Sequence, residues 1–496
     1  MEHKPYWRNI SVPQFKPLQE DINVGTVIVG AGMCGLLCAY LLLQKGESNI
    51  AVIDAGEICG GTTSGTTAKI TCQHGLIYAR LLDGLGKERT QMYLNANRQA
   101  IDTFEQISSQ HNINCGFTRG SAWLYTTSES GVHEIEAEAE AAKLFGMDAI
   151  ISTKTELTFP VKSALMFPGQ AFFHPLKFAY AICDILVKSG VKIYTHTQAL
   201  GARDGIVNTA GGNNIRAKNI TSCSHYPFID KPSLMFTKVF RERSYVLALE
   251  NAVEMNDMYL DIEKDGLSFR PLKDDIGRDM LLLSAFDHKS GHESEKSHFD
   301  DLMLQAEKLY PSAKARWMWS AQDNITHDNI PYIGRWQSAG ENIFIATGFN
   351  KWGMTSSMVA ADIISEQIVN GKHEYEGIFC IDRRDIGLQA KSFIKESADI
   401  AGNFLTHLKI PDKQLDDVKR GEGAIVELNM ERLGIYRDDS GKIYAVKPVC
   451  THMGCAIKWN KDENTWDCTC HGSRFDYAGN VINGPAQKPL IRLEII

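Results

Sequence analysis

The spacing of hydrophobic and polar residues changes twice along the chain, and each pattern predicts a different kind of element. Near the N-terminus, the apolar runs at 23–29 and 49–53 are typical of buried parallel strands, and the apolar stretch between them, which stops at Gly46, predicts a helix. In the middle, alternation over 245–250 and an apolar run at 281–286 predict strands of another sheet. The last part of the chain has short strand patterns, at 424–428, 432–437 and 442–447, which predict a small antiparallel β module of about 80 residues.

The composition is that of a globular protein with no affinity for nucleic acid. Of the 496 residues, 44% are hydrophobic and 23% are charged, and the net charge of −8 comes with no basic block. The N-terminus has no apolar signal region, and the most apolar helix-like run, 35–43, is too short to span a bilayer. We therefore expect no transmembrane segment, a cytoplasmic location and no nucleic-acid partner.

A glycine-rich turn follows the first predicted strand. The sequence Gly30-Ala-Gly32-Met-Cys-Gly35 has the G-x-G-x-x-G spacing, and Asp54 follows the second predicted strand. Gly30 allows a tight turn, and Gly32 lets the backbone approach a pyrophosphate. Gly35 lets the helix and strand pack closely, and Asp54 stands where a carboxylate bonds the ribose hydroxyls. Strand, turn, helix, strand and acid in this order predict a dinucleotide site.

The small Gly/Thr-rich loop at 59–75 identifies the dinucleotide. It resembles the second flavin-contacting segment of FAD oxidoreductases of the D-amino-acid oxidase and glycine oxidase family, although a flexible surface loop is the alternative. Cys72 and His74 do not stand where relatives with covalent flavin tether it, so noncovalent FAD is expected. The resemblance implies FAD contacts from the small residues of the loop, Thr62, Thr63, Thr66 and Thr67.

Two later segments extend this resemblance to about residues 22–370. Residues 324–335 resemble the D-G-x-P-x-I-G signature of the family, and 342–368 resemble its closing strand and helix. No second G-x-G-x-x-G occurs between residues 76 and 330, so NAD(P)H is not the expected electron donor and this region is interpreted as a substrate domain. The resemblance implies further FAD contacts from the turn and helix start, Gly348, Gly353 and Met354.

One departure from the family indicates the substrate. Amino-acid-oxidising relatives carry an arginine just upstream of the D-G-x-P motif, where it binds the substrate carboxylate, and this chain has Asp323 there. Because a carboxylate favours a cation, we predict an amine rather than a simple amino acid. Lys351, in the flavin-side turn, is a candidate for gating the pocket or assisting dioxygen. Arginines elsewhere are alternative anion-binding residues, Arg270 first among the catalytic candidates, with Arg243 and Arg335.

Cysteines and histidines gather near the C-terminus. Fifteen residues separate Cys450-x-His452 from Cys468-x-x-His471. The cysteine spacings there differ from the C-x-x-C knuckles of zinc ribbons, although a structural zinc site and a plain disulfide remain alternatives. Residues 450–455 and 468–473, together with 483–486, resemble the ligand boxes and proline loop of Rieske iron–sulfur proteins.

The Rieske resemblance implies a role for each of these residues. Cys450 and Cys468 would bind one iron of a 2Fe–2S cluster, and His452 and His471 the other. Two neutral imidazoles in place of two thiolates raise the reduction potential of such a cluster. The remaining two cysteines of the segment would form a disulfide, Cys455–Cys470, and the eight cysteines elsewhere are expected to be mostly free and buried.

Two positions are expected to tune the cluster potential. Ser473 matches a serine whose hydroxyl bonds a bridging sulfide. Phe475 stands where high-potential members have tyrosine, so one hydrogen bond is missing and a somewhat lower potential is expected. Histidines at the tip of a loop are also expected to be exposed, so that electrons can leave there.

The expected fold class is an α/β, Rossmann-like FAD domain with an α+β substrate domain, followed by a small all-β Rieske domain. The predicted organisation has an N-terminal extension over 1–22 and an FAD-dependent oxidoreductase over 23–370, in which FAD-binding and substrate subdomains interleave. A helical connector over 371–412 and the Rieske domain over 413–496 follow.

The predicted function is oxidation of a small substrate, an amine or amino-acid derivative, with electrons relayed through the cluster to an external acceptor. Two alternatives stay open: an electron-transfer or redox-sensing protein, and a dioxygen-using oxidase in which the Rieske module serves for docking. The sequence names neither the substrate nor the acceptor.

Overall fold

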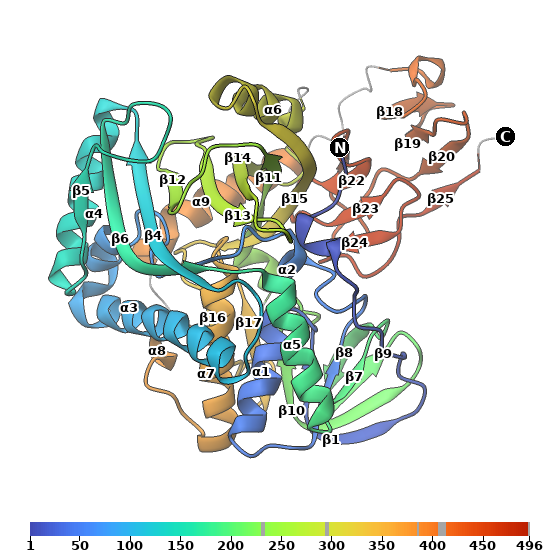
Figure 1. Ribbon diagram of the computed structural model, residues 1–496. Helices are drawn as coiled ribbons and strands as arrows, with labels where there is room; N and C mark the ends of the chain where they lie inside the picture. Colours follow the sequence, from blue (N-terminus) through green and yellow to red (C-terminus); the bar gives the residue numbers. More distant parts are fainter. Residues whose placement is uncertain (230–233, 293–296, 384–385, 405–412, 495–496) are drawn as a thin grey trace.

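The computed structural model describes residues 1–229, 234–292, 297–383, 386–404 and 413–494. Two mixed sheets form the larger part of the molecule, and the C-terminal residues form a separate small β unit beside them (Figure 1). Of the described residues, none belong to a helix long and apolar enough to cross a membrane.

The first sheet carries the predicted glycine turn. Its strands run in the order β16-β17-β10-β1-β2-β7, and the neighbours from β17 to β7 are parallel. The hairpin β8–β9 pairs with β10. The bounds are β1 (Ile22–Val29), β2 (Ile50–Ile53), β7 (Lys192–Tyr194), β8 (Ala199–Arg203), β9 (Ile206–Thr209), β10 (Asn214–Ser222), β16 (Tyr332–Arg335) and β17 (Ile343–Thr347).

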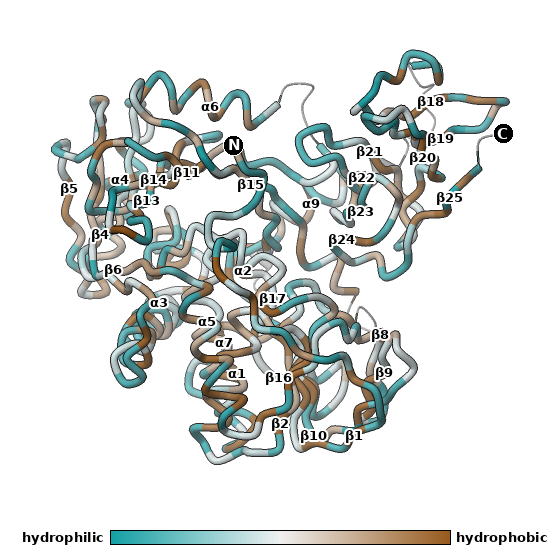
Figure 2. The backbone as a smooth tube through the Cα atoms, turned by 45° about the vertical axis from the view of Figure 1, so that its right-hand side comes forward, coloured by the Kyte–Doolittle hydropathy of each residue, from teal (hydrophilic) through white to brown (hydrophobic). Residues whose placement is uncertain are grey.

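Helices cover one face of this sheet, and their buried apolar side chains share a core with that face. Ile28 and Val52 point into a core shared with these helices, while Val27 and Ala51 point to the opposite face, which packs against residues of the β8–β9 hairpin. Figure 2 shows the hydrophobic residues gathered in α1, β1, β2 and β10. The helices are α1 (Met33–Gln44), α3 (Tyr78–Gln110), α5 (Pro175–Lys188) and α7 (Gly353–Asn370).

The second sheet runs in the order β15-β11-β14-β13-β12-β4-β6-β3, with β5 paired to β6. Its long antiparallel pair, β11 with β15, extends from Val239–Thr326 to Glu250–Lys314 and reaches both the first sheet and the C-terminal unit. The strands are β3 (Lys69–Ile70), β4 (Thr118–Thr126), β5 (Ile150–Ser152), β6 (Ser163–Phe172), β11 (Val239–Glu250), β12 (Met258–Asp261), β13 (Ser268–Lys273), β14 (Asp279–Lys289) and β15 (Lys314–Thr326). Shorter and flanking helices are η1 (Tyr6–Asn9), α2 (Thr62–Gly65), α4 (Glu129–Leu144), η2 (Met235–Thr237) and α6 (His298–Leu309).

The C-terminal unit consists of two antiparallel sheets, β18-β19-β20-β25 and β21-β22-β23-β24. Along the chain, three helices follow α7 and precede the first strand of this unit: α8 (Glu376–Phe379), α9 (Ile386–Phe404) and η4 (Leu415–Asp417). Ile400 of α9 packs against the core of the unit. The strands are β18 (Glu422–Leu428), β19 (Glu431–Arg437), β20 (Ile443–Val446), β21 (Ile457–Asn460), β22 (Thr465–Cys468), β23 (Arg474–Asp476), β24 (Val481–Asn483) and β25 (Arg492–Leu493).

The elements predicted from the hydrophobic pattern are confirmed, with ends shifted by a few residues. The first two strands are β1 and β2, the helix between them is α1, and the alternating segment at 245–250 is the end of β11. The predicted helical connector over 371–412 contains two helices, at 376–379 and 386–404, and its residues 384–385 and 405–412 lie outside the described residues.

Candidate active site and cluster site

The glycine turn between β1 and α1 has the geometry that a dinucleotide needs. Gly30 has a φ of +111°, and a Cβ there would lie 2.5 Å from the carbonyl oxygen of Cys223. A Cβ on Gly35 would lie 1.8 Å from the carbonyl oxygen of Gly30, so only glycine lets the helix approach the turn. Asp54 accepts hydrogen bonds from the amides of Ala31 (2.7 Å) and Gly56 (2.8 Å), and burial raises its pKa.

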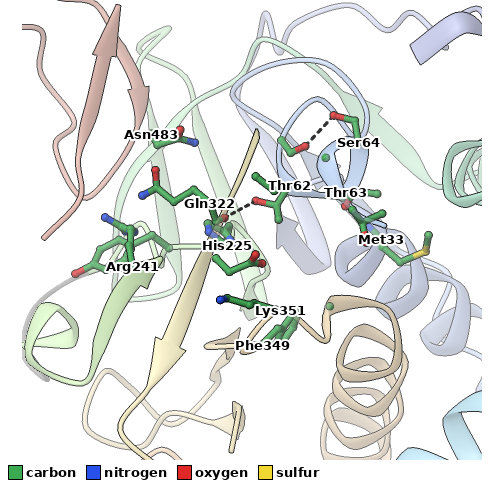
Figure 3. A pocket seen from close by; sticks show the side chains of 18 of the residues that line it. Met33, Thr62, Thr63, Ser64, His225, Arg241, Gln322, Phe349, Lys351 and Asn483 are labelled. Carbon is green, nitrogen blue, oxygen red and sulfur yellow. Dashed lines mark hydrogen bonds between the residues drawn. The ribbon is translucent and has the colours of Figure 1, made fainter. Parts of the chain in front are cut away.

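The threonine loop faces this turn across a cavity of about 1330 Å³. Thr63 Oγ1 accepts a hydrogen bond from the Met33 amide at 3.0 Å, and Thr62 Oγ1 donates to the carbonyl of Gln322 at 3.4 Å (Figure 3). The buried Trp7 indole donates to the Thr66 carbonyl at 2.7 Å and holds the loop from behind. The cavity is lined by every predicted FAD contact except Gly35, namely Gly30, Gly32, Asp54, Thr62, Thr63, Thr66, Thr67, Gly348, Gly353 and Met354.

Two thiols and two imidazoles converge at one end of the C-terminal unit. Cys450 and Cys468 are buried in one core cluster, and the rings of His452 and His471 stand perpendicular with centroids 5.3 Å apart. The donors come from two loops, one before β21 and one between β22 and β23. Two thiols and two imidazoles are the donor set of a Rieske centre.

Comparison with known proteins agrees with both sites. A family model described as FAD dependent oxidoreductase matches residues 26–367, and one described as Rieske [2Fe-2S] domain matches residues 409–494. The chain belongs to the FAD dependent oxidoreductase family and carries a Rieske domain. Its cofactors are accordingly FAD and a 2Fe–2S cluster.

One curated relative aligns along almost the whole chain. The chain is 36% identical to YhfW of Bacillus subtilis (strain 168), whose name describes a Rieske 2Fe-2S iron–sulfur protein, over 99% of this chain and 97% of that one. Among solved structures, glycine oxidase of Geobacillus kaustophilus has a TM-score of 0.61 at 17% identity and covers 73% of this chain and 99% of that one. L-proline dehydrogenase of P. horikoshii has a TM-score of 0.60 at 16% identity, with 73% and 97% covered. These structural similarities show the fold.

The residues present fit both cofactors. The cavity exceeds the about 300–1,000 Å³ of an ordinary small-molecule site, which leaves room for a dinucleotide and a substrate. Gly32 lines the cavity, and a Cβ there would lie 3.0 Å from Thr63 Oγ1, between the turn and the threonine loop where a pyrophosphate approaches the backbone. Cys450, His452, Cys468 and His471 supply the four ligands that a Rieske cluster requires.

The tuning and disulfide positions surround the predicted cluster ligands. Ser473 Oγ accepts a hydrogen bond from the amide of Ala486 at 3.0 Å, and its side chain also hydrogen-bonds Cys450. Phe475 is fully buried in the same apolar core. Cys455 and Cys470 are buried thiols in the structure, so the disulfide between them stays a prediction.

Acidic side chains gather around Lys351 at the wall of the cavity. Its ammonium pairs with Glu242 (2.7 Å) and Asp287 (2.5 Å). Asp323 lies opposite Glu242 in the β11–β15 register, and burial raises its pKa to about 6 while Lys351 opposes the shift. Burial lowers the pKa of Lys351, but the two paired carboxylates outweigh it and leave the pKa raised. Of these four side chains, Asp287, Asp323 and Lys351 line the cavity, and Glu242 lies behind them as a partner of Lys351.

The candidate arginines lie elsewhere. Arg270 is buried against Trp7 and Phe172 and donates to the carbonyl of Phe173 at 2.5 Å, and it does not line the cavity. The structure therefore does not bring it together with Asp323 and Lys351. Arg335 and Arg243 also lie outside the lining: Arg335 bonds the carbonyls of Glu341 and Gln367, and Arg243 pairs with Glu463 of the Rieske domain.

Lys69 is a cavity residue that sequence reasoning missed. Its ammonium donates to the carbonyl of Tyr259 (3.1 Å) and to Ser268 Oγ (2.5 Å). Burial, with a contribution from the charge of Arg270, lowers its pKa to about 7. No distinct signal in the sequence marks it, because Lys69 is a single lysine within the loop at 59–75.

The Rieske domain forms part of the wall of the FAD cavity. Residues 480–487, which include the predicted proline loop, line the cavity, and Asn483 lies on the same side as Arg241 and Gln322 in Figure 3. The histidine tip differs from the expectation of full exposure: His471 is 8% exposed, and the Phe236 ring lies 5.0 Å from its ring and 5.5 Å from that of His452. The tip faces the rest of the chain because β11 and β15 extend beneath it.

Proposed function

We propose that this protein dehydrogenates a small cationic amine at a CH–NH bond and passes the electrons within the chain to the Rieske cluster and then to an external acceptor. The observation that carries this proposal is the shared cavity wall: residues of the FAD cradle and of the Rieske domain line one space. Bound FAD takes two electrons from an organic substrate, and a 2Fe–2S cluster carries one electron at a time.

The acidic end of the cavity supports a cationic substrate. Asp323 replaces a carboxylate-binding arginine, and its carboxyl ionises above about pH 6 next to Glu242 and Asp287. Lys351 is held by the latter two carboxylates, which leaves Asp323 as the group that orients an ammonium. The arginines of the described lining are Arg8 near the N-terminus, Arg241 on β11 and Arg474 in the Rieske domain, and none of them pairs with Lys351 or its acidic partners.

Lys69 supplies the proton acceptor in this proposal. An amine gives a hydride to a flavin only in its neutral form, so the bound ammonium must first lose a proton. The lowered pKa of Lys69, about 7, leaves much of its side chain neutral at physiological pH and able to accept that proton. The names of the structural neighbours, glycine oxidase and L-proline dehydrogenase, concern substrates with CH–NH bonds and agree with this reaction class.

An anaerobic titration with a substrate panel tests the proposal. Amines, amino acids and 2-hydroxy acids are added in turn, and the flavin and cluster absorption bands are followed separately. We expect amines to bleach the flavin and then the cluster, while dithionite as a control reduces both. Bleaching by hydroxy acids or amino acids with inert amines would contradict the substrate class, and a cluster that stays oxidised beside bleached flavin would favour an oxidase with a docking Rieske module.

A further inference from the structure

Arg241 on β11 reaches from the FAD cavity to a cluster ligand. Its side chain is 3% exposed and lines the cavity, where the guanidinium lies 4.6 Å from the ring centre of Tyr226. Nε donates to Asn324 Oδ1 at 3.0 Å, and Nη1 donates to the backbone carbonyl of His471. One side chain therefore separates the cavity from the backbone of a predicted cluster ligand.

Gln322 on β15 makes a parallel contact. Its amide donates to the carbonyl of Gly472 at 2.8 Å, and it also lines the cavity. Gly472 has a φ of +65°, and a Cβ there would lie 2.9 Å from Arg241 Cδ. The cluster loop therefore needs glycine at position 472, because a side chain there would collide with Arg241 and keep the loop away from the β11–β15 pair.

Buried charges hold the Rieske domain in this position. Arg243, next along β11, pairs with Glu463 and lies 3.9 Å from Asp467, and neither Arg243 nor Asp467 is exposed. Arg474 bonds the same two carboxylates at 2.7 and 3.2 Å. Separating the domains would break the ion pairs that Arg243 makes with Glu463 and Asp467, which are largely shielded from water at this contact. The contact is therefore a fixed interface.

We propose that Arg241 is a positioning residue for electron entry: it holds the His471 loop against the wall of the FAD cavity and raises the cluster potential with its fixed positive charge. Electrons enter the cluster from the flavin side of the same chain. Each two-electron oxidation of substrate would then be balanced by two equivalents of an external one-electron acceptor. This inference rests on the proposed direction of electron flow.

The sign of the effect on potential follows from Coulomb interaction. Reduction adds one negative charge to the cluster, and a buried cation beside a ligand backbone stabilises the reduced form. Removing the charge by Arg241→Gln should therefore lower the potential, while Arg241→Lys keeps the charge and loses the two-armed hydrogen bonding. Gln322→Leu removes a hydrogen bond to the same loop and leaves the charge in place.

The experiment uses full-length protein with both cofactors and no organic substrate. The cluster potential is measured by redox titration followed by EPR, and the bound flavin is photoreduced anaerobically with EDTA while the cluster band is recorded. Arg316→Gln, an exposed arginine on β15, is the matched control.

We expect Arg241→Gln to shift the flavin–cluster electron equilibrium at least tenfold, about 59 mV for one electron, and to slow cluster reduction at least tenfold. Arg241→Lys should restore most of the potential, Gln322→Leu should slow reduction with a smaller change in potential, and Arg316→Gln should match the unaltered chain. Unchanged potential and rate in Arg241→Gln with full cofactor content would overturn the inference. Because photoreduction bypasses the substrate, failure of the amine proposal would leave this result unchanged. Likewise, an unchanged potential in Arg241→Gln would not bear on whether amines reduce the flavin.

Discussion

At the scale of single residues, the function depends on which charges face the cavity. Asp323 is predicted, from the resemblance at 324–335, to stand where amino-acid-oxidising relatives carry an arginine, and its neighbours Glu242 on β11 and Asp287 on β14 are also acidic. The sequence alone indicated this departure, because the motif around Asp328 fixed the position. It did not indicate Lys69 or Arg241, because a lone lysine or arginine in a strand has the same local pattern whether it lies in a core, at an interface or in a cavity.

Asp323→Asn should weaken amine binding. Burial places the pKa of Asp323 at about 6, so the attracting negative charge is present above this pH and is lost as the pH falls through it. We expect at least a tenfold rise in the KM for a reactive amine at pH 8, and a smaller rise in KM from pH 7 to pH 5 than the control Arg316→Gln shows, because the control keeps the Asp323 carboxyl. Steady-state kinetics across this pH range would contradict the assignment if the variant kept the low KM and its pH dependence.

Phe475→Tyr should raise the cluster potential. The added hydroxyl supplies a hydrogen bond toward a ligand sulfur, and Ser473→Ala, which removes one next to Cys450, should lower the potential. Because Phe475 is fully buried, retention of the cluster absorption and of thermal stability must be checked first. Redox titration of both variants gives the answer; equal potentials in Phe475→Tyr and the unaltered chain would show that position 475 does not tune the cluster.

At the scale of elements, local chemistry made some parts predictable. β1, the glycine turn, α1 and β2 each carry their own signal, and so do the two cluster loops, because backbone approach and metal ligation demand particular residues at fixed spacings. α3, β4 and β6 carry only moderately amphipathic or mixed patterns, and their place is decided by long-range pairing. The partners of Arg243 belong to another domain, so no nearby sequence could specify them.

Gly30→Ala should abolish FAD retention and leave the cluster in place. The substitution puts a Cβ 2.5 Å from the carbonyl of Cys223 at a φ of +111°. Gly46→Ala is the matched control, since Gly46 also has positive φ, +91°, but nothing lies within 4 Å of its Cβ position. We expect at least a tenfold loss of FAD per cluster in the first variant and near-normal FAD in the second, measured on purified protein. Equal FAD content in both would show that the turn does not bind the cofactor.

At the scale of the whole molecule, two folds meet around one cavity. The Rieske residues 480–487 line the space that also contains the glycine turn and the threonine loop, and Arg241 and Gln322 bind the cluster loop from the other side of the same wall (Figures 1 and 3). The sequence predicted the two domains and their cofactors, but not that their sites face each other. That arrangement depends on buried charge pairs and on glycine at position 472.

The most direct test of the central claim is the kinetics of electron arrival at the cluster. Full-length protein is mixed anaerobically with a reactive amine, and the flavin and cluster bands are recorded at several protein concentrations. The shared cavity predicts that the flavin bleaches first and that the cluster follows with a first-order rate independent of protein concentration. A cluster that stays oxidised, or whose reduction rate rises in proportion to protein concentration, would contradict transfer within one chain.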